Sequence, residues 1–569
     1  MWMASVARCG WLLASYTIRL KIFFHPDSST QSVEEASPKT SNDAGAFRGS
    51  WMESRRGRRF QAYRGIRFAE PPVGELRFQP PVEILNYTDE VDASQDGPAC
   101  PQPNYDNYNI DEDCLRLNVY TPYNSSTALL PVVVYMHAGG FYSVSGRSDV
   151  AGPSHLLDRD IVLVTINYRL GTLGFLSTGD EYAPGNNGFK DQVAALRWIQ
   201  RNIGSFGGDP DLVTISGYSA GSFSVMLHTV SPMSTGLFHR AISMSGSPIS
   251  QIAIPEHQRY LAERQATLLN CSTDTTQVMI DCLKNKTSKE IGDSLDSMFE
   301  FGYDPVLMWM PVVEPDCGQQ RFLTKQPLKS VCNGEMQEVP YIISQTQDEF
   351  FWKAFNVLRN ETLLATMKDD WHRIAAIAFY LSGEDAATQA DALMQAYLGG
   401  NQLANDTATA DGLGKLYADA IIGFGVHRLT KLISRYSSQP VYSYEFSYVG
   451  NSSHYVDPAT KKPVGAAHHD DLIYLFNVSY SFPSIPVSDS ADSQMVDTMT
   501  GIFYNFARYG DPNPRDDTPE IATLSWPTVK TDSSRYVRID KEFSVHENLF
   551  EDRYSVWEEL YPMDYETCQ

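Results

Sequence analysis

A serine flanked by two glycines is the first group in this sequence whose setting favours chemistry. Residues 216–222 are SGYSAGS, a G-x-S-x-G pattern centred on Ser219. The apolar run LVTI precedes it at 212–215, and the helix-compatible FSVMLHTV follows at 223–230. Glycines permit the tight strand-to-helix turn that exposes a serine hydroxyl. We therefore predict that Ser219 is a nucleophile, the alternative being an ordinary Gly/Ser loop.

A pair of glycines further upstream supplies a second chemical signal. The apolar run PVVVYM at 131–136 is followed by HAGGF, which resembles the HGGG loop whose backbone N–H groups bind the oxyanion of a tetrahedral intermediate. Ala138 departs from that pattern, whereas Gly139 and Gly140 keep the two donor positions. The N–H of Ala220, just after the serine and at a helix N-terminus, would be a third donor.

The elements that must position these groups are short apolar runs, which are typical of buried central strands. Helical patterns lie between the runs, such as KDQVAALRWIQRN at 190–202. Strands alternating with helices predict an α/β fold with a mostly parallel sheet and helices on both faces. Chemistry gathers at the carboxyl ends of such strands. The runs are PVVVYM at 131–136, IVLVTI at 161–166, LVTI at 212–215, AISM at 241–244 and YII at 341–343.

Composition narrows the class of protein. The 569 residues include 45 Lys+Arg and 69 Asp+Glu, which gives a net charge of −24, and 42% of them are hydrophobic. Such a chain can bury a large core, and its acidic surface would repel the phosphate backbone of nucleic acids. No run approaches the length of about 18 apolar residues that a membrane-spanning helix needs. We therefore predict a soluble protein without a nucleic-acid partner, of unknown oligomeric state.

Beyond these motifs, the sequence resembles the type-B carboxylesterases of the cholinesterase/carboxylesterase family, which have the α/β-hydrolase fold. The resemblance extends from about Gly45 to Pro562 and is nearest to insect-type carboxylesterases, including the juvenile-hormone-esterase-like group. It implies a serine carboxylic ester hydrolase. The matching segments are YRGIRFAEPPVGELRF from Tyr63, EDCLRLNVYTP from Glu112, NYRLGTLGFLS from Asn167, FGGDPDLVTISGYSAGS from Phe206 and NFARYGDPNP from Asn505.

The resemblance supplies a candidate general base. A serine hydroxyl needs a histidine to accept its proton and a carboxylate to orient that imidazole. The segment GAAHHDDL at 465–472 is similar to the family's G-x-x-H-x-D/E-D/E-L, and alignment on Leu472 selects His468. His469 is the alternative, which we interpret as a solvated or hydrogen-bonded loop histidine. The remaining histidines, His137 included, lack such a setting and are interpreted as structural or exposed.

The orienting acid is expected after a central strand. The run YII is followed by SQTQDEF, which resembles the family's acid segment and places Glu349 in the catalytic position. Asp348 is the rival, and either carboxylate could instead be a solvated turn residue. The family usually has glycine after the acid, whereas this chain has Phe350. The alignment therefore leaves open whether Asp348 or Glu349 is the acid. The chain order of serine, acid and histidine fits this fold.

These residues imply two-step acyl transfer that requires no metal or organic cofactor. Ser219 would attack an ester carbonyl with His468 as base, and water would then release the acid. Choline esters are disfavoured because the loop from Pro101 to Asp113 has no Trp, and Tyr218 stands where cholinesterases carry an acidic residue. We predict small to medium hydrophobic esters as substrates. The aromatic-rich stretch at 298–310 could line an apolar pocket, although core packing explains such density equally well.

Two alternative functions remain open at this point. One is a juvenile-hormone-specific esterase, although that group typically has Gln where Tyr218 stands. The other is a catalytically inactive adhesion or binding protein of the same family. Such proteins typically lose a triad residue and add a transmembrane segment, whereas this chain keeps Ser219, Glu349 and His468. The sequence therefore favours catalysis.

Eight cysteines include three close pairs that would each close a short loop, as disulfides do. Metal binding is the competing interpretation, and the lack of any Cys-x-x-Cys disfavours it. Cys568 is expected to be free or intermolecular. The expected pairs, of which the resemblance implies the first two and we add the third, are Cys100–Cys114, Cys271–Cys282 and Cys317–Cys332.

Eight N-x-[ST] sequons in polar, turn-rich surroundings predict a secreted glycoprotein. Arg8 and the apolar run at 9–18 could form a signal peptide, although Arg19 and Lys21 follow at once. Residues 1–44 are thus expected to be a leader with a flexible segment, followed by a single α/β-hydrolase domain with large insertions over 45–569. The sequons are at Asn86, Asn124, Asn270, Asn285, Asn360, Asn405, Asn451 and Asn477.

Overall fold

The computed structural model describes residues 36–103, 109–122, 128–515, 518, 525–531 and 533–563. The elements below all belong to the compact unit that begins at Ser37. The expected signal peptide, the sequon at Asn124 and Cys568 lie outside the described residues.

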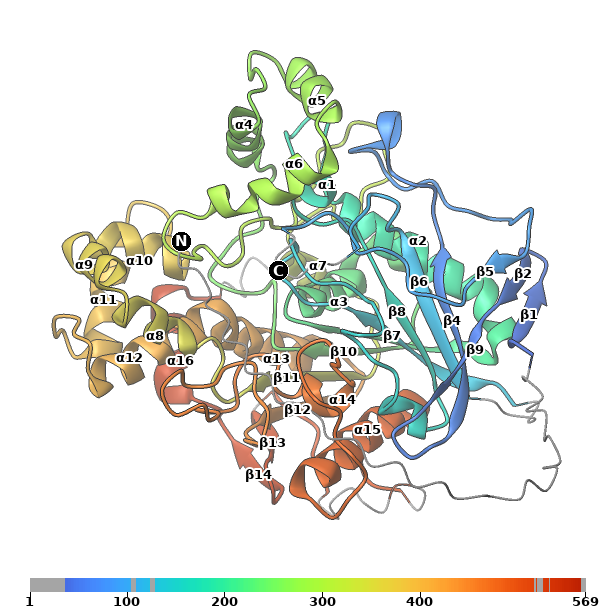
Figure 1. Cartoon of the computed structure of the whole chain (residues 1–569). Coiled ribbons are helices and arrows are strands. Elements are labelled where there is room, and N and C mark those ends of the chain that lie inside the picture. Colours follow the sequence, from blue (N-terminus) through green and yellow to red (C-terminus); the bar gives the residue numbers. More distant parts are fainter. Residues whose placement is uncertain are drawn as a thin grey trace, which may run out of the picture. The chain divides into compact units, whose positions relative to one another are not determined.

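A large sheet is built from most of the strands. The strands are β1 (Lys39–Asn42), β2 (Gly45–Arg48), β3 (Ser50–Glu53), β4 (Arg59–Arg67), β5 (Val91–Asp92), β6 (Arg116–Pro122), β7 (Leu130–Met136), β8 (Val162–Ile166), β9 (Gly208–Tyr218), β10 (Arg240–Met244), β11 (Tyr341–Thr346), β12 (Val441–Phe446), β13 (Arg535–Ile539) and β14 (Ser544–Glu547). An 11-stranded sheet has the order β14-β13-β12-β11-β10-β9-β7-β8-β6-β4-β3 (Figure 1). Pairing is parallel from β13 through β8 and antiparallel at both edges.

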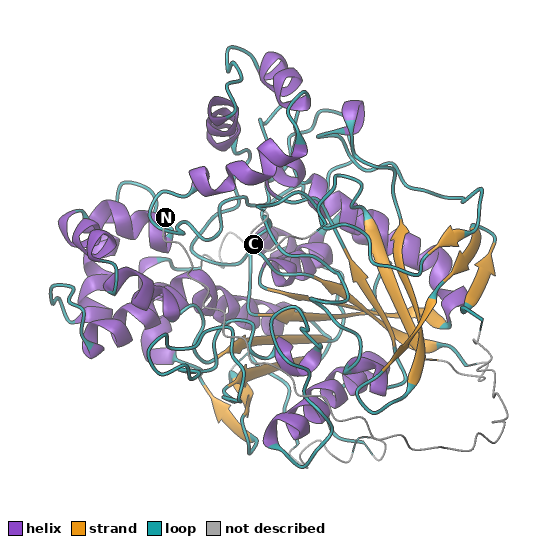
Figure 2. Cartoon of the chain, viewed as in Figure 1, coloured by secondary structure: helices purple, strands orange, loops and turns teal. Residues whose placement is uncertain are grey.

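Helices cover both faces of this sheet, as Figure 2 shows. Val132 and Val134 of β7 belong to one core with α2, α3 and α13, whereas Val133 and Tyr135 belong to the opposite core with α15. The helices are α1 (Gly171–Phe175), α2 (Asn187–Asn202), α3 (Ala220–Val230), α4 (Arg259–Leu268), α5 (Thr276–Lys284), α6 (Ser288–Asp293), α7 (Pro327–Cys332), α8 (Trp352–Leu358), α9 (Glu361–Asp369), α10 (Trp371–Phe379), α11 (Ala386–Leu398), α12 (Thr407–Ala418), α13 (Phe424–Tyr436), α14 (Leu472–Leu475), α15 (Ala491–Tyr509) and α16 (Glu551–Leu560).

The predicted strands and the predicted α/β fold are confirmed. The five apolar runs lie in β7, β8, β9, β10 and β11, except that Ile161 lies one residue before β8, and every residue of β7, β8 and β11 is buried. A strand that packs against helices on both faces needs apolar side chains in both directions, which is why these runs show no alternation. The helical pattern at 190–202 lies within α2.

The compact part of the described chain begins before residue 45, within the segment expected to be a leader. Lys39–Asn42 form β1, which pairs antiparallel with β2 in a small sheet with β5. The polar side chains that suggested a loose leader are used as anchors: the Thr40 hydroxyl donates to the carbonyl of Ser205 at 2.6 Å, and the Asn42 amide donates to the Asn202 side chain at 3.0 Å. A polar composition is therefore not enough to show that a segment lies outside the fold.

The disulfide predictions are confirmed for two pairs and wrong for the third. Cys100 is bonded to Cys114 and Cys271 to Cys282. Cys332, at the end of α7, is disulfide-bonded, whereas Cys317 is an exposed free thiol. The proposed Cys317–Cys332 pair therefore does not exist. Short spacing along the chain permits a bridge only where the two Cβ atoms also face each other.

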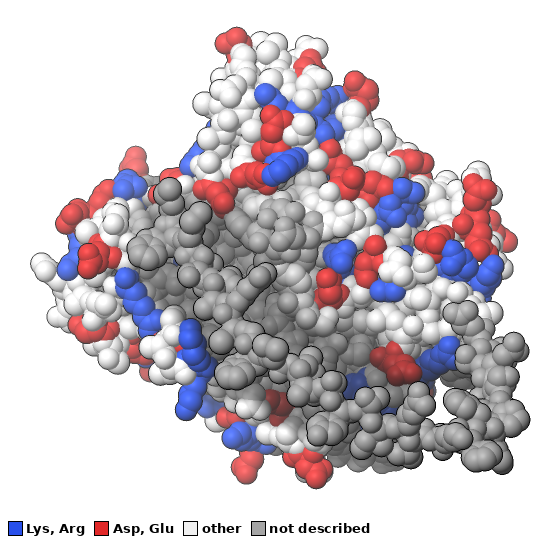
Figure 3. Space-filling model, viewed as in Figure 1, with Lys and Arg blue, Asp and Glu red and all other residues white. Residues whose placement is uncertain are grey.

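The described surface is polar and mixed in charge. Lys/Arg and Asp/Glu side chains lie interspersed on the visible described part of Figure 3. Among the described residues, no helix combines the length and the apolarity that spanning a bilayer requires. Asn477 is half-buried, and the other described sequon asparagines are exposed: Asn86, Asn270, Asn285, Asn360, Asn405 and Asn451.

Candidate active site

Ser219 lies on the sharp turn between β9 and α3. Its backbone has φ 54° and ψ −117°, a strained conformation for a non-glycine residue, of the kind that costs about 1–3 kcal/mol. The turn is held by the Ser219 N–H, which donates to the carbonyl of Met244 at 2.9 Å. A Cβ on Gly221 would lie 2.0 Å from the carbonyl oxygen of Met136, so only glycine lets α3 start this close to β7. Ser219 is 6% exposed.

The HAGGF loop directly follows β7, the sheet neighbour of β9. Gly139 has φ 105° and Gly140 φ 59°, and a Cβ on Gly139 would lie 2.1 Å from the carbonyl oxygen of Ser143. The loop closes because the N–H groups of Tyr142 and Ser143 donate to the carbonyl of Gly139 at 2.9 and 3.0 Å. Within the described part of the chain, the N–H groups of Gly139 and Gly140 donate no hydrogen bond. They remain available to an anionic oxygen.

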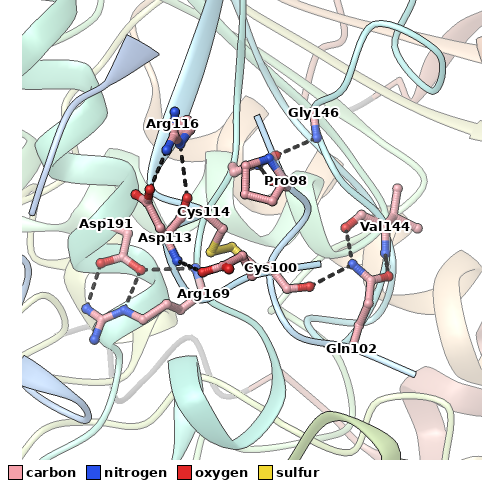
Figure 4. The surroundings of a disulfide bond; sticks show 12 residues. Pro98, Cys100, Gln102, Asp113, Cys114, Arg116, Val144, Gly146, Arg169 and Asp191 are labelled. Atoms are coloured by element: carbon pink, nitrogen blue, oxygen red, sulfur yellow. Dashed lines mark hydrogen bonds and ion pairs between the residues drawn. A yellow bond between two sulfur atoms is a disulfide. The ribbon is translucent and has the colours of Figure 1, made fainter. Parts of the chain in front are cut away.

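The HAGGF loop is supported by the segment that carries the disulfide Cys100–Cys114. Figure 4 shows Gln102 between Cys100 and Val144. The Gln102 amide donates to the carbonyls of Cys100 and Val144 at 3.1 and 2.9 Å, and its oxygen accepts from the Val144 N–H at 2.8 Å. Because Cys100 is tied to Cys114, the segment that follows the glycine pair is anchored to a cross-linked loop.

Glu349 and His468 are in contact. Glu349 lies three residues after the end of β11, and one of its carboxylate oxygens contacts Nδ1 of His468. The other oxygen accepts a hydrogen bond from the N–H of Thr346 at 2.8 Å. Both side chains are buried, at 1% and 3% exposure. Since β9, β10, β11 and β12 are adjacent and parallel, the segments that carry the serine, the acid and the base leave the same end of the sheet.

Asp348, the rival acid, faces a different group. Its N–H donates to the carbonyl of Ala466 at 3.0 Å, and its carboxylate accepts from the Ala466 N–H at 3.1 Å. Burial raises the pKa of Asp348 to about 6. Asp348 thus ties the acid segment to Ala466, which lies two residues before His468. It does not contact the imidazole itself.

The imidazole of His468 is enclosed by rings. The centroids of Phe350, His469 and Tyr218 lie 4.2, 4.2 and 5.0 Å from its own. Its Nε2 is buried and has no hydrogen-bond partner among the described residues. Phe350 has φ 45°, in the region that favours glycine, which explains why glycine usually stands there in the family that the sequence resembles. His468 is therefore oriented at Nδ1 by Glu349 and left with Nε2 for chemistry.

His469 and His137 are both structural in this geometry. The N–H of His469 donates to the Tyr218 hydroxyl at 2.9 Å, and burial lowers the pKa of the His469 side chain well below its usual value. His469 is hydrogen-bonded through its backbone, and its side chain lines a cavity. His137 is 1% exposed and stacks on Tyr168, and burial lowers its pKa to about 4.

A cavity of about 370 Å³ borders both the HAGGF loop and His469. Ala138 and Tyr142 line it on one side, and Phe299 and Tyr303 of the aromatic-rich stretch line it on another. Other apolar residues of that stretch, such as Trp309, are buried in the core. His454 also lines the cavity, and no sequence motif singled it out, because its loop meets the His468 segment only in the folded chain.

The family assignment rests on the sequence model of the carboxylesterase family, which matches residues 35–557. The chain belongs to the carboxylesterase family. This carboxylesterase is 36% identical to the juvenile hormone esterase of Tribolium castaneum over 87% of this chain and 86% of that protein. It is 34% identical to venom carboxylesterase-6 of Apis mellifera, with 88% and 90% covered, and 35% identical to esterase FE4 of Myzus persicae, with 84% and 85% covered.

A solved structure shares the fold of the carboxylesterase. The crystal structure of juvenile hormone esterase from Manduca sexta, with OTFP covalently attached, aligns with a TM-score of 0.82 at 27% identity, covering 93% of this chain and 100% of that one. The α/β-hydrolase fold and the activity class expected from the sequence are thereby confirmed. The carboxylesterase is a serine carboxylic ester hydrolase.

Proposed function

We propose that this carboxylesterase hydrolyses neutral, apolar esters with a triad of Ser219, His468 and Glu349. The observation that carries the proposal is the buried contact between Nδ1 of His468 and the Glu349 carboxylate. A carboxylate there holds the neutral imidazole in the tautomer whose Nε2 can accept a proton. Nε2 has no other partner among the described residues.

In the first half of the reaction, Ser219 attacks the ester carbonyl carbon while Nε2 of His468 takes the hydroxyl proton. The carbonyl oxygen becomes an oxyanion, which the N–H groups of Gly139, Gly140 and Ala220 stabilise. His468 then gives its proton to the departing alcohol as the carbon–oxygen bond breaks. The product is an acyl-serine.

In the second half, water takes the place of the alcohol. His468 accepts a proton from the water as its oxygen attacks the acyl carbon, and it returns this proton to Ser219 when the acid leaves. Glu349 keeps its charge throughout and stabilises the transient imidazolium. Its second oxygen is fixed by the Thr346 N–H, so the carboxylate does not rotate away.

The substrate class follows from the cavity next to these groups. Among the described residues that line it there is no Asp, Glu, Lys or Arg, and aromatic and aliphatic side chains predominate. A cation would find no countercharge there, whereas an apolar acyl or alcohol group would be desolvated favourably. These features support small to medium hydrophobic esters.

A substitution at each end of the proton path tests the mechanism. We expect purified wild type to hydrolyse a short-chain p-nitrophenyl ester, and Ser219→Ala and His468→Ala to lose this activity while unfolding at temperatures near that of wild type. An organophosphate should label wild type, and peptide mapping should locate the label on Ser219. A label on another residue, or full activity in Ser219→Ala, would overturn the assignment.

A juvenile-hormone-type ester is a second candidate substrate. This candidate is supported by two relatives, from Tribolium castaneum and Manduca sexta, which are named juvenile hormone esterases. A kcat/KM for juvenile hormone far above that for a simple alkyl ester of similar size would favour it. Equal values would favour general ester hydrolysis.

We also propose that the enzyme is a secreted glycoprotein with one catalytic domain, which extends over 45–569 and includes the strand β1 before it. The 11-stranded sheet takes strands from β3 to β14, and the described sequons are mostly exposed. Expression in an animal cell line should deliver the enzyme to the medium, with a mass that falls on treatment with an N-glycosidase. Retention of unglycosylated enzyme in the cytosol would refute secretion.

A further inference from the structure

A second histidine–carboxylate pair lies on the wall of the cavity next to the proposed triad. Nδ1 of His454 lies 3.2 Å from a carboxylate oxygen of Asp470. His454 lines the cavity of about 370 Å³, and its side chain is 28% exposed. The mechanism proposed above uses neither residue.

Asp470 is anchored so that it fixes the position of His454. It is 3% exposed and accepts hydrogen bonds from the N–H of His454 at 2.7 Å and from the Ser453 hydroxyl at 2.6 Å. It also accepts from the N–H of Ala467 at 2.9 Å, one residue before His468. The loop that carries His454 is therefore tied directly to the segment that carries the proposed base.

The ring of His454 has one polar atom left for a ligand. Asp470, a hydrogen-bond acceptor, holds the Nδ1–H tautomer, which makes Nε2 of the neutral ring an acceptor. The ring packs between His469 and Phe482, at centroid distances of 5.4 and 4.8 Å. Among the described residues, Nε2 of His454 has no hydrogen-bond partner.

Two other polar side chains of the cavity wall are already used. Gln102 is bonded to the backbone of Cys100 and Val144, and the Ser143 hydroxyl donates to the carbonyl of Gly139 at 3.2 Å. Pockets of this kind bind a ligand mainly through apolar contacts and orient it with a few fixed polar groups. The free nitrogen of His454 is such a group.

We propose that His454 is a specificity-determining residue that accepts a hydrogen bond from a hydroxyl group on the ester, at a distance from the scissile carbonyl. The proposal rests on the proposed function, since it assigns the polar part of the substrate. The preferred substrates are accordingly hydrophobic esters that carry one hydroxyl in the chain held by the cavity. An ether oxygen at the same place has no proton to donate and gains nothing.

The test compares esters of nearly equal shape. The first pair is p-nitrophenyl heptanoate and p-nitrophenyl ω-hydroxyhexanoate, in which a hydroxyl replaces a methyl group. The second pair makes the same exchange in the alcohol, with heptyl butyrate and ω-hydroxyhexyl butyrate. A methoxy analogue of each serves as the ether. The readout is the ratio of kcat/KM between hydroxy and alkyl ester, which cancels any loss of rate common to both.

In His454→Phe we expect this ratio to fall about tenfold relative to wild type in one of the two series, since a hydrogen bond of about 1.4 kcal/mol is lost. His454→Gln, which keeps a polar group, should recover part of the ratio. The matched control is His372→Phe, because Nε2 of His372 also pairs with a carboxylate, that of Asp391 at 2.8 Å, but on the exposed surface of α10. It should leave the ratio unchanged.

Two results would overturn the proposal. One is an unchanged ratio in both series in His454→Phe, provided that this variant or His454→Gln unfolds near the wild-type temperature. The other is an equal gain for the methoxy and the hydroxy ester in wild type, which would exclude an acceptor nitrogen. Failure of the proposed function would give a different result. In that case the hydrolysis of the alkyl esters would be absent in wild type or would persist in Ser219→Ala.

Discussion

At the scale of single residues, two adjacent carboxylates show how position in a turn decides chemical role. Glu349 contacts Nδ1 of His468, whereas Asp348 accepts from the backbone N–H of Ala466. Successive residues in an extended turn point their side chains in different directions. One carboxylate therefore reaches the imidazole, and its neighbour reaches the backbone that carries it.

This division predicts opposite outcomes for two conservative changes. Glu349→Gln should lower kcat by a factor on the order of 10⁴, because the amide no longer stabilises the imidazolium and permits the wrong tautomer. Asp348→Asn keeps an oxygen for the Ala466 N–H and should retain a kcat close to that of wild type. Steady-state kinetics on one p-nitrophenyl ester measures both. The reverse pattern would make Asp348 the acid.

A pH series of unfolding experiments tests whether Asp348 is buried as the structure shows. The raised pKa, about 6 against an ordinary 3.8, means that the folded state binds the Asp348 proton more tightly than the unfolded state. Wild-type stability should then fall between about pH 4 and pH 6, by up to about 3 kcal/mol, and level off above. Asp348→Asn should lack this fall. Urea denaturation across that range measures it, and parallel curves would contradict the pKa shift.

The sequence identified some of these residues and left others open for a physical reason. Ser219 and the pair Gly139 and Gly140 stand in short motifs whose geometry is local, so neighbouring residues suffice to find them. Whether Asp348 or Glu349 is the orienting acid depends on which side chain faces a segment more than 100 residues away, as the contact of Glu349 with His468 shows. His454 stands in no motif, and its contact with Asp470, 16 residues away, forms only when the loop between them folds.

At the scale of elements, the loop after β7 owes its shape to a neighbouring loop. The Gln102 side chain bonds both the N–H and the carbonyl of Val144, four residues after Gly140. The disulfide of Cys100 holds Gln102 in place from the other side. The geometry of the proposed oxyanion donors is therefore supported from outside their own segment.

Gln102→Leu tests this support. It leaves the N–H and carbonyl of Val144 without partners, which should lower the free energy of unfolding by about 1–3 kcal/mol. It should also lower kcat with little change in KM, because the donors act mainly on the transition state. Urea denaturation and steady-state kinetics provide the two readouts.

The matched control is Gln200→Leu. Gln200 donates to the carbonyls of Pro210 and Leu237 at 2.9 and 3.0 Å, away from the proposed site. It should lose stability on a similar scale without a change in kcat. Equal losses of kcat in both variants would mean that the effect of Gln102 is global.

Element prediction succeeded where burial is uniform and failed where it is not. Strands such as β7 are apolar on both faces and are therefore visible in the sequence. β1 alternates exposed and half-buried polar residues and was interpreted as part of a loose leader. A short edge strand gains its stability from backbone pairing and anchoring side chains, which leave little trace in composition.

At the scale of the whole molecule, one sheet gathers the chemistry of four separate chain segments. The HAGGF loop follows β7, Ser219 follows β9, Glu349 follows β11 and His468 lies in the segment after β12. Neighbouring parallel strands bring these segments to one edge. The long insertions between them, with α4 to α7 after β10 and α8 to α13 after β11, lie outside this arrangement.

The cavity wall takes only part of its lining from those insertions, and the rest comes mainly from the loop after β7 and the segment after β12. Phe299 and Tyr303 belong to the insertion between β10 and β11, and His454 and Tyr480 to the segment after β12. Substitutions confined to these stretches can change which esters are accepted while the reacting groups keep their supports. The enzyme is thus a suitable scaffold for directed evolution, in which a library limited to the insertions explores new substrates and active-site titration with an organophosphate counts the variants that remain intact.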